Sequence, residues 1–162
     1  MYLTQLGCAE PTPDSPMKTH LIRAATSNDG PQLAHLLTSL GHDTSSERIA
    51  SMWAIWTEQG NRALVASWPD EQLIGVATLH QMHVLHRPRP VGRITALFVD
   101  ARARGNGIGR DLVHAAETEL RKRGCGLLEI TSHSRLIEAH AFYEHLGYRR
   151  TSVRLAKDLP EA

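Results

Sequence analysis

The sequence predicts a single mixed α/β (α+β) domain, and three observations lead to this prediction. The chain has 162 residues, 41% of them hydrophobic and 22% charged, which is the size and balance of one globular domain with its own core. Short strand-like runs are interspersed along the chain with runs of helical periodicity. Glycines stand just past the ends of the helical runs, where a helix commonly closes.

The beginning of the chain differs from the rest. Residues 1–16 carry three prolines and no sustained periodicity, which is typical of a flexible lead. The domain itself is therefore expected over residues 17–162.

One strand and two helices are predicted next. Residues 19–26 read as a strand, and residues 31–40 place four leucines on one helical face. A second helix follows up to Gly60, with Thr44 and Glu47 in a capping-box pattern at its start.

Three strands are expected in the middle of the chain, over residues 62–68, 73–85 and 93–100. The loop between the last two is rich in proline and arginine. Strict alternation over 93–100 would place Ile94, Ala96 and Phe98 on one face and Thr95, Leu97 and Val99 on the other.

The last part of the chain again mixes helices and strands. A helix over 107–123 shows one apolar stripe and ends in basic residues that suit the helix dipole. A strand at 126–132, a helix at 135–146 and a last strand at 148–159 complete the prediction.

Composition excludes several classes of function. A formal net charge of +1 gives no basic excess for nucleic acid or an anionic membrane, so neither partner is expected. With only two cysteines, Cys8 and Cys125, the sequence argues against a disulfide framework, which fits a reducing cytoplasm. No apolar run approaches the ~20 residues that span a bilayer, and no signal peptide is recognisable.

The stretch RARGNGIGRDL, residues 102–112, carries the clearest chemistry. Glycines 105, 107 and 109 follow a strand and open a helix, so backbone N–H groups and the helix dipole can attract an anion such as pyrophosphate. A turn that only starts a helix is the simpler alternative. The spacing fits neither the GxGxxG dinucleotide fingerprint of oxidoreductases nor the GK[ST] of a P-loop.

RGNGIG, residues 104–109, resembles the R/Q-x-x-G-x-G/A signature of the GNAT N-acetyltransferase superfamily. The residues RITALFVDARARGNGIGRDLVHAAETELRKRGCGLLEITS look like the acetyl-CoA unit of that family, and AHAFYEHLGY looks like its C-terminal helix. The resemblance covers residues 19–159. It implies a GNAT-like acyl-CoA N-acyltransferase fold, a splayed mixed sheet flanked by four helices, with acetyl-CoA as co-substrate.

The resemblance also implies roles for particular residues. Main-chain groups of Leu97, Phe98 and Val99 would pair with pantetheine, and an amide near Val99 would polarise the acetyl carbonyl. The pyrophosphate would be held by the loop and its flanking cations: Arg104, Gly105, Asn106, Gly107, Ile108, Gly109 and Arg110. Tyr143 would protonate the departing thiolate as general acid. Its alternative role is a core aromatic whose hydroxyl finds a partner.

The general base and the acceptor are left open. Many relatives carry a glutamate in the strand before the glycine loop, where this chain has Thr95. A water chain, a histidine such as His80 or His83, or a neutral acceptor amine could substitute. His80, His83 and His86 do not favour a metal site, because residues three apart in a strand point to opposite faces.

The sequence therefore predicts transfer of acetyl from acetyl-CoA to a primary amine by direct attack in a ternary complex. The acceptor is a small molecule or peptide of unassigned kind, and Trp53 is a candidate contact for it. The alternative is a non-catalytic acyl-CoA-binding sensor that has lost the base. Members of the family are often dimers, which leaves a homodimer open.

Overall fold

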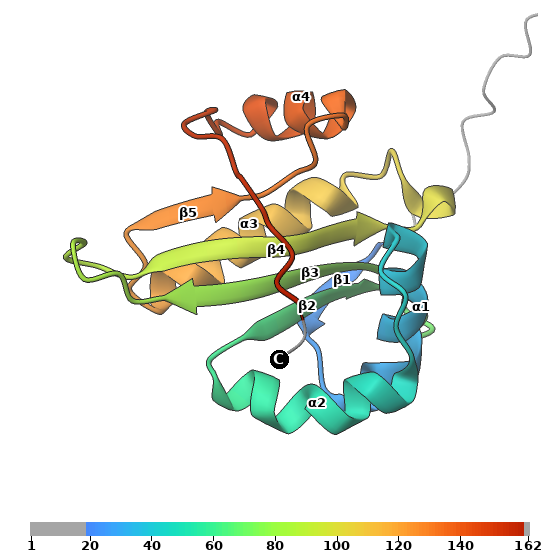
Figure 1. Ribbon diagram of the computed structural model, residues 1–162. Coiled ribbons are helices and arrows are strands. Elements are labelled where there is room, and N and C mark those ends of the chain that lie inside the picture. Colours follow the sequence, from blue (N-terminus) through green and yellow to red (C-terminus); the bar gives the residue numbers. More distant parts are fainter. Residues whose placement is uncertain (1–18, 161–162) are drawn as a thin grey trace, which may run out of the picture.

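The computed structural model describes residues 19–160, which form a five-stranded mixed sheet with helices on both faces (Figure 1). The strands lie in the order of the sequence, and all neighbours are antiparallel except the last pair, which is parallel. They are β1 (Leu21–Ala24), β2 (Arg62–Ser67), β3 (Leu73–Met82), β4 (Val91–Val99) and β5 (Leu127–Ile130). The helices are α1 (Gly30–Leu40), α2 (Ser46–Glu58), α3 (Ile108–Lys122) and α4 (Ile137–His145). The predicted mixed α/β class with four helices is confirmed, whereas the predicted lead at 1–16 lies outside the described residues.

Two apolar clusters cover the two faces of the sheet. Helix α3 is the right length and amphipathicity to lie along one face, and its side chains Ile108, Leu112, Val113, Ala116 and Leu120 are at most 1% exposed. Leucines of α1 pack on the opposite face, against Val65 and Val76. Full burial of each valine, leucine or isoleucine side chain among them contributes about 1.5–3 kcal/mol. Successive side chains of β2 point to opposite faces, so Leu64 packs in the α3 cluster and Val65 packs in the α1 cluster.

Strand β4 does not alternate as predicted, because it bulges. Thr78 of β3 lies opposite Ala96, while Leu79 lies opposite Ile94, so Thr95 is an extra residue on β4. The bulge moves Leu97 and Val99 to the α3 face together with Ile94, and leaves Ala96 and Phe98 on the α1 face. The expected grouping of Ile94, Ala96 and Phe98 is therefore wrong.

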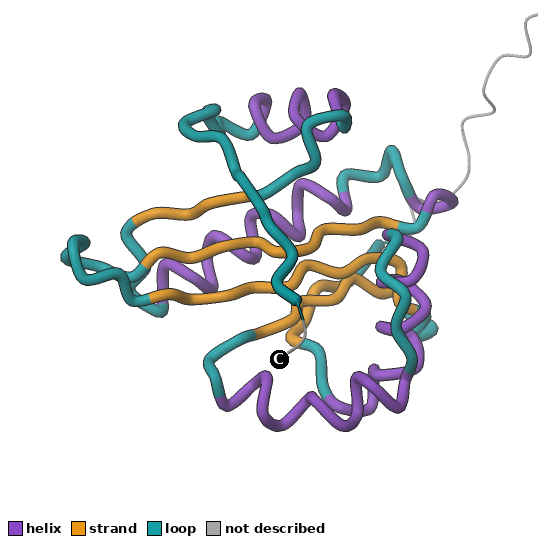
Figure 2. Tube along the Cα trace, in the orientation of Figure 1, coloured by secondary structure: helices purple, strands orange, loops and turns teal. Residues whose placement is uncertain are grey.

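Strands β4 and β5 pair only over Val91–Ile94 and Leu127–Ile130. Beyond Ile94, β4 continues to Val99 without β5 beside it. The chain leaves the sheet after β5 and returns through α4, which Figure 2 shows standing apart from the strands. The sheet is therefore open between the two strands, at the end where β4 meets the glycine-rich loop.

Two local predictions differ from the structure. Residues 148–160 form no strand, and the apolar side chains of Val153, Leu155 and Leu159 are 82–90% exposed. Their alternation is strand-like, but a strand also needs a neighbouring edge, which alternation cannot supply. Helix α2 is capped by Ser45, whose hydroxyl accepts the Arg48 N–H at 3.2 Å, so the predicted capping register from Thr44 is displaced by one residue.

Candidate active site

The glycine-rich loop places free donors at the start of α3. Gly105 and Gly107 have φ of +82° and +77°, a left-handed backbone that glycine adopts without a Cβ clash. Gly107 is the N-cap residue, and the first helical bond runs from Asp111 N–H to the Gly107 carbonyl at 3.0 Å. The N–H groups of the first helical turn therefore have no acceptor within the helix, which is the arrangement that binds anions.

The charged side chains around this loop are held in place by the strand end and the helix start. Arg104 donates from Nε to the Val99 carbonyl at 3.1 Å, and its guanidinium lies 6.0 Å from the centre of the Phe98 ring. Arg110 is 60% exposed, with Nε 3.6 Å from Asp111. Of the two predicted cations, Arg104 is anchored to β4, and the more exposed Arg110 keeps its guanidinium close to Gly107 of the loop.

Tyr143 on α4 lies in an aromatic cluster beside this loop. Its ring makes edge contacts with Phe142 at 5.2 Å and with Tyr148 at 6.1 Å between centroids. Within residues 19–160 its hydroxyl has no hydrogen-bond partner, and burial raises the pKa of that hydroxyl above its ordinary value of 10. Tyr143 is half-buried, and its hydroxyl is not enclosed by the fold, so it can reach a ligand.

Phe142 connects α4 to the loop. A Cβ placed on Gly109 would lie 3.5 Å from the ring of Phe142 and 3.8 Å from Val99. These are ordinary van der Waals distances, so α3, α4 and β4 meet at Gly109, and neither its space nor its backbone requires a glycine there. This contact brings the helix that carries Tyr143 to the loop and to the end of β4.

Tyr148 differs from Tyr143 although both belong to the same cluster. Its hydroxyl donates to Glu117 at 3.0 Å, and burial together with this bond raises its pKa. The hydroxyl is thus already committed within the fold.

A cavity of about 390 Å³ opens on the α1–α2 side of the sheet, next to the bulge in β4. Its walls come from α1, α2, the loop between them, and strands β2, β3 and β4. The lining residues are Leu33, Leu37, His42, Asp43, Thr44, Arg48, Ile49, Met52, Trp53, Trp56, Ala63, Thr78, Thr95 and Ala96. Of the predicted acceptor contacts, Trp53 and Thr95 lie here.

Sequence reasoning missed Asp43 and Arg48, which bring charge to this cavity, and His42, which lines it beside them. They stand in the short α1–α2 loop and in the first turn of α2, where no spacing motif marks them. Their place in the sequence was the available signal. Polar residues in a short loop between two amphipathic helices lie at the rim of any cavity that the helices cover.

Thr95 stands on β4 at the position where the family resemblance led us to expect a glutamate. Its hydroxyl lies 2.8 Å from that of Thr78 and 3.3 Å from the Thr78 carbonyl. Thr95 is exposed to the cavity, and no carboxylate stands beside it on β4.

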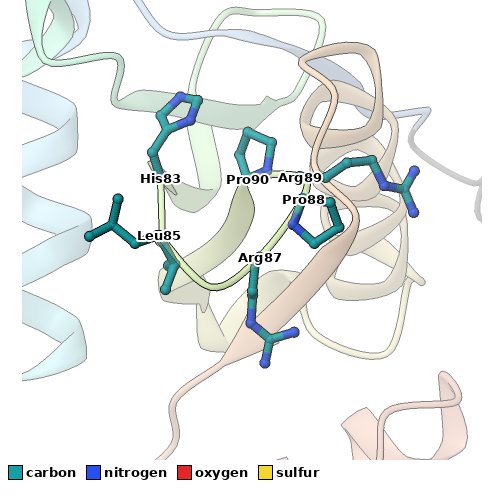
Figure 3. A pocket seen from close by; sticks show the side chains of 7 residues that line it. His83, Leu85, Arg87, Pro88, Arg89 and Pro90 are labelled. Carbon is teal, nitrogen blue, oxygen red and sulfur yellow. The ribbon is translucent and has the colours of Figure 1, made fainter.

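The structure places His80 and His83 away from this cavity. His80 lies on β3, and its ring is hydrogen-bonded to the side chain of Asn61. His83 lines a smaller hollow of about 200 Å³ within the loop between β3 and β4 (Figure 3). The guanidinium groups of Arg87 and Arg89 point away from that hollow in Figure 3, so it lacks convergent polar groups.

Within residues 19–160, none of the helices combines the length and the apolar character that crossing a membrane requires. No group of three or more His, Cys, Asp or Glu side chains in that range could hold a metal ion.

Comparison with known proteins identifies the class to which this arrangement belongs. The sequence profile of the acetyltransferase (GNAT) family matches residues 31–148, so the chain belongs to that family. The fold is also similar to that of an acetyltransferase from Trypanosoma brucei, with a TM-score of 0.77 and 25% identity over 87% of this chain and 100% of that one. The predicted family and its fold are confirmed.

Individual relatives are similar over different lengths. The aminoalkylphosphonate N-acetyltransferase of Salmonella typhimurium is 34% identical over 88 residues, which cover 54% of this chain and 57% of the relative. The matched segment thus spans little more than half of that enzyme. The aminoglycoside N(6')-acetyltransferase type 1 of Stenotrophomonas maltophilia is 26% identical over 80% of this chain and 86% of its own.

Proposed function

We propose that this protein transfers an acetyl group from acetyl-CoA to a primary amine by direct attack. One relationship carries the proposal: the free donors of the α3 N-terminus adjoin the end of β4, and α4, the helix that carries Tyr143, packs at the same place through Phe142. A loop that can bind phosphate and a group that can donate a proton, both near the end of β4, suit the pyrophosphate and the thioester of one extended cofactor. The names of the relatives, which act on amines of different kinds, agree with an amine acceptor.

The residues present suit acetyl-CoA. The first-turn N–H groups of α3, assisted by Arg104 and Arg110, would hold the pyrophosphate. Main-chain groups of Leu97 to Val99 would pair with pantetheine, since β5 does not extend beside this part of β4. Acetyl-CoA supplies the activated acetyl group as a thioester.

The chain's own groups then act on the reaction. A main-chain N–H near Val99 would donate to the acetyl oxygen as negative charge develops on it. Tyr143 would donate its proton to the departing sulfur, and burial favours the protonated state that this role requires. Holding both reactants in line across β4 supplies a further part of the rate.

The acceptor amine would reach β4 through the cavity of about 390 Å³, whose wall includes Thr95 and Ala96. These two residues directly precede the segment proposed for pantetheine. The amine must lose a proton during the transfer, and the lining offers no carboxylate on β4 for this purpose. We therefore propose that the acceptor enters in its neutral form or loses its proton to water.

The experiment combines binding with turnover. Purified protein is titrated with acetyl-CoA by calorimetry, and thiol release is followed with a panel of primary amines. Saturable acetyl-CoA binding together with amine-dependent thiol release and acetylated product supports the proposal. Absence of acetyl-CoA binding would contradict it. The homodimer expectation is tested on the same preparation by light scattering.

A second candidate function rests on Thr95. A threonine, hydrogen-bonded to Thr78 where a carboxylate base would stand, also suits a protein that binds acyl-CoA without turning it over. Tight acetyl-CoA binding with no thiol release for any amine would favour this sensor.

A further inference from the structure

We infer that the acceptor is a hydrophobic primary monoamine, an amine nitrogen carried on an apolar body of about ring size. The inference rests on the proposed function and specifies its substrate class. It disfavours two other classes of substrate: acceptors with several positive charges, and short acceptors that carry a phosphonate.

The cavity fixes which end of the acceptor reacts. Thr78 and Thr95 form its polar end on the sheet, and Ala96 continues directly into the strand proposed for pantetheine. An amine that attacks the acetyl group must therefore place its nitrogen beside the two threonines. The remainder of the molecule then extends along the inner surfaces of α1 and α2.

The walls along that path are apolar and aromatic. Leu33 and Ala63 close the cavity, at 2% and 4% exposure. Trp53 and Trp56 present two rings whose centroids are 5.7 Å apart and whose planes meet at 41°. Rings set at an angle offer both a face and an edge to a flat apolar group. A volume of about 390 Å³ is at the lower end of the range for small-molecule sites.

The charges are few, and they lie at the rim. Among the described residues of the lining, Asp43 is the one carboxylate and Arg48 the one arginine, and both are exposed, as is the neighbouring His42. Neither forms an ion pair with the other or with another residue in the described range. A single carboxylate cannot neutralise an acceptor with several ammonium groups.

A short aminoalkylphosphonate fits poorly for a different reason. Its anionic group lies only a few bonds from the nitrogen, so with the nitrogen beside the two threonines it would be held within the mainly apolar lining rather than at the exposed Arg48. Burying that charge among apolar side chains without a partner is strongly unfavourable.

The test compares three probes in the thiol-release assay: 2-phenylethylamine, 2-aminoethylphosphonate and kanamycin. We expect kcat/KM for 2-phenylethylamine to exceed the other two by about 10-fold or more, since each missing apolar contact or unpaired charge costs at least that factor. A higher kcat/KM for kanamycin or for the phosphonate would overturn the inference.

Variants locate the effect in the cavity. Trp53→Leu should raise the KM for 2-phenylethylamine about 10-fold with little change in kcat, as expected for lost ground-state binding. Trp68→Leu is the matched control, because Trp68 packs in the α3 cluster on the other face. Met52→Glu adds a carboxylate at an exposed helix position of the lining, so it tests the site without removing core volume. We expect it to lower kcat/KM for 2-phenylethylamine relative to kanamycin, and unchanged ratios in both cavity variants would contradict the inference.

A binding measurement keeps the inference separate from turnover. Tryptophan fluorescence follows 2-phenylethylamine binding to the protein in the presence of coenzyme A. Binding that Trp53→Leu weakens supports the inference even if no amine is acetylated, in which case the proposed transfer alone fails. No binding and no turnover with this amine would overturn the inference.

Discussion

The hydroxyl oxygens of Thr78 and Thr95 lie 2.8 Å apart across β3 and β4, where the bulge makes Thr95 an extra residue on its strand. The pair forms the polar end of the cavity beside α2. A hydroxyl is a poor proton acceptor near neutral pH, so the reaction proposed for this site should depend on the protonation state of the acceptor.

We therefore expect kcat/KM to rise about tenfold per pH unit below the pKa of the acceptor amine, near ~10. Thr95→Glu should bring a carboxylate to this position and flatten the rise, giving more activity near pH 7. Thr95→Val keeps the shape without the hydroxyl and should retain the wild-type profile. The measurement is thiol release from pH 6 to 10, and a profile already flat in the wild-type protein would contradict this expectation.

The two tyrosines of the aromatic cluster should differ in their effect on catalysis. Tyr143→Phe removes a hydroxyl with no partner in the described fold and should lower kcat about 100-fold while acetyl-CoA binding persists. Tyr148→Phe removes a hydroxyl bonded to Glu117 and should mainly lower the free energy of unfolding, by about 1–2 kcal/mol. Kinetics and calorimetry measure both, and equal kcat losses would remove Tyr143 as general acid.

Gly105, in the proposed phosphate-binding loop, can be compared with Gly124, a control glycine of the same backbone conformation. Both have φ of +82°, and a Cβ at either would meet no atom within 4 Å. Alanine at either position should therefore lower stability similarly, by about 1–2 kcal/mol. Only Gly105→Ala should also weaken acetyl-CoA binding, because Gly124 lies past the far end of α3. Equal affinities measured by calorimetry would argue against the proposed loop.

Alkaline conditions should destabilise the protein through the same cluster. Burial first, and for Tyr148 also the bond to Glu117, raise the folded-state pKa of Tyr143 and Tyr148 above the unfolded value of about 10. Stability that is complete below pH 10 is then lost as the pH rises further, by up to ~1.4 kcal/mol per pH unit for each tyrosine. Urea unfolding from pH 8 to 11 measures this slope. Tyr148→Phe should reduce it, and an unchanged slope would assign the loss to other groups.

Local sequence patterns were sufficient for much of the fold. The leucine stripe of α1 and the stripe of α3 repeat with the helical period, and each lies against the sheet as predicted. The order strand, loop, helix, strand around residues 104–109 predicted the loop at the α3 N-terminus, and the motif RGNGIG carried the resemblance to the family. These features depend on residues near one another in the chain.

Features that depend on distant neighbours were not predictable in the same way. The alternation of residues 148–159 resembles a strand, yet the segment pairs with no strand because pairing needs a free edge in register. The bulge at Thr95 likewise exists only relative to Thr78 and Leu79 on β3. That single extra residue reversed the expected faces for the rest of β4.

The sequence by itself determined the helices, most strands, the glycine-rich loop and the family, because periodicity, capping residues and a contiguous motif are local properties. The tertiary structure decided which residues meet at the site. Within residues 19–160 it left the Tyr143 hydroxyl without a hydrogen-bond partner, and it bonded that of Tyr148 to Glu117. It also gathered Asp43, Arg48 and two tryptophans beside Thr95, from segments that share no spacing in the sequence. Such a set arises only when the sheet and α2 pack together, since packing brings distant residues within contact distance.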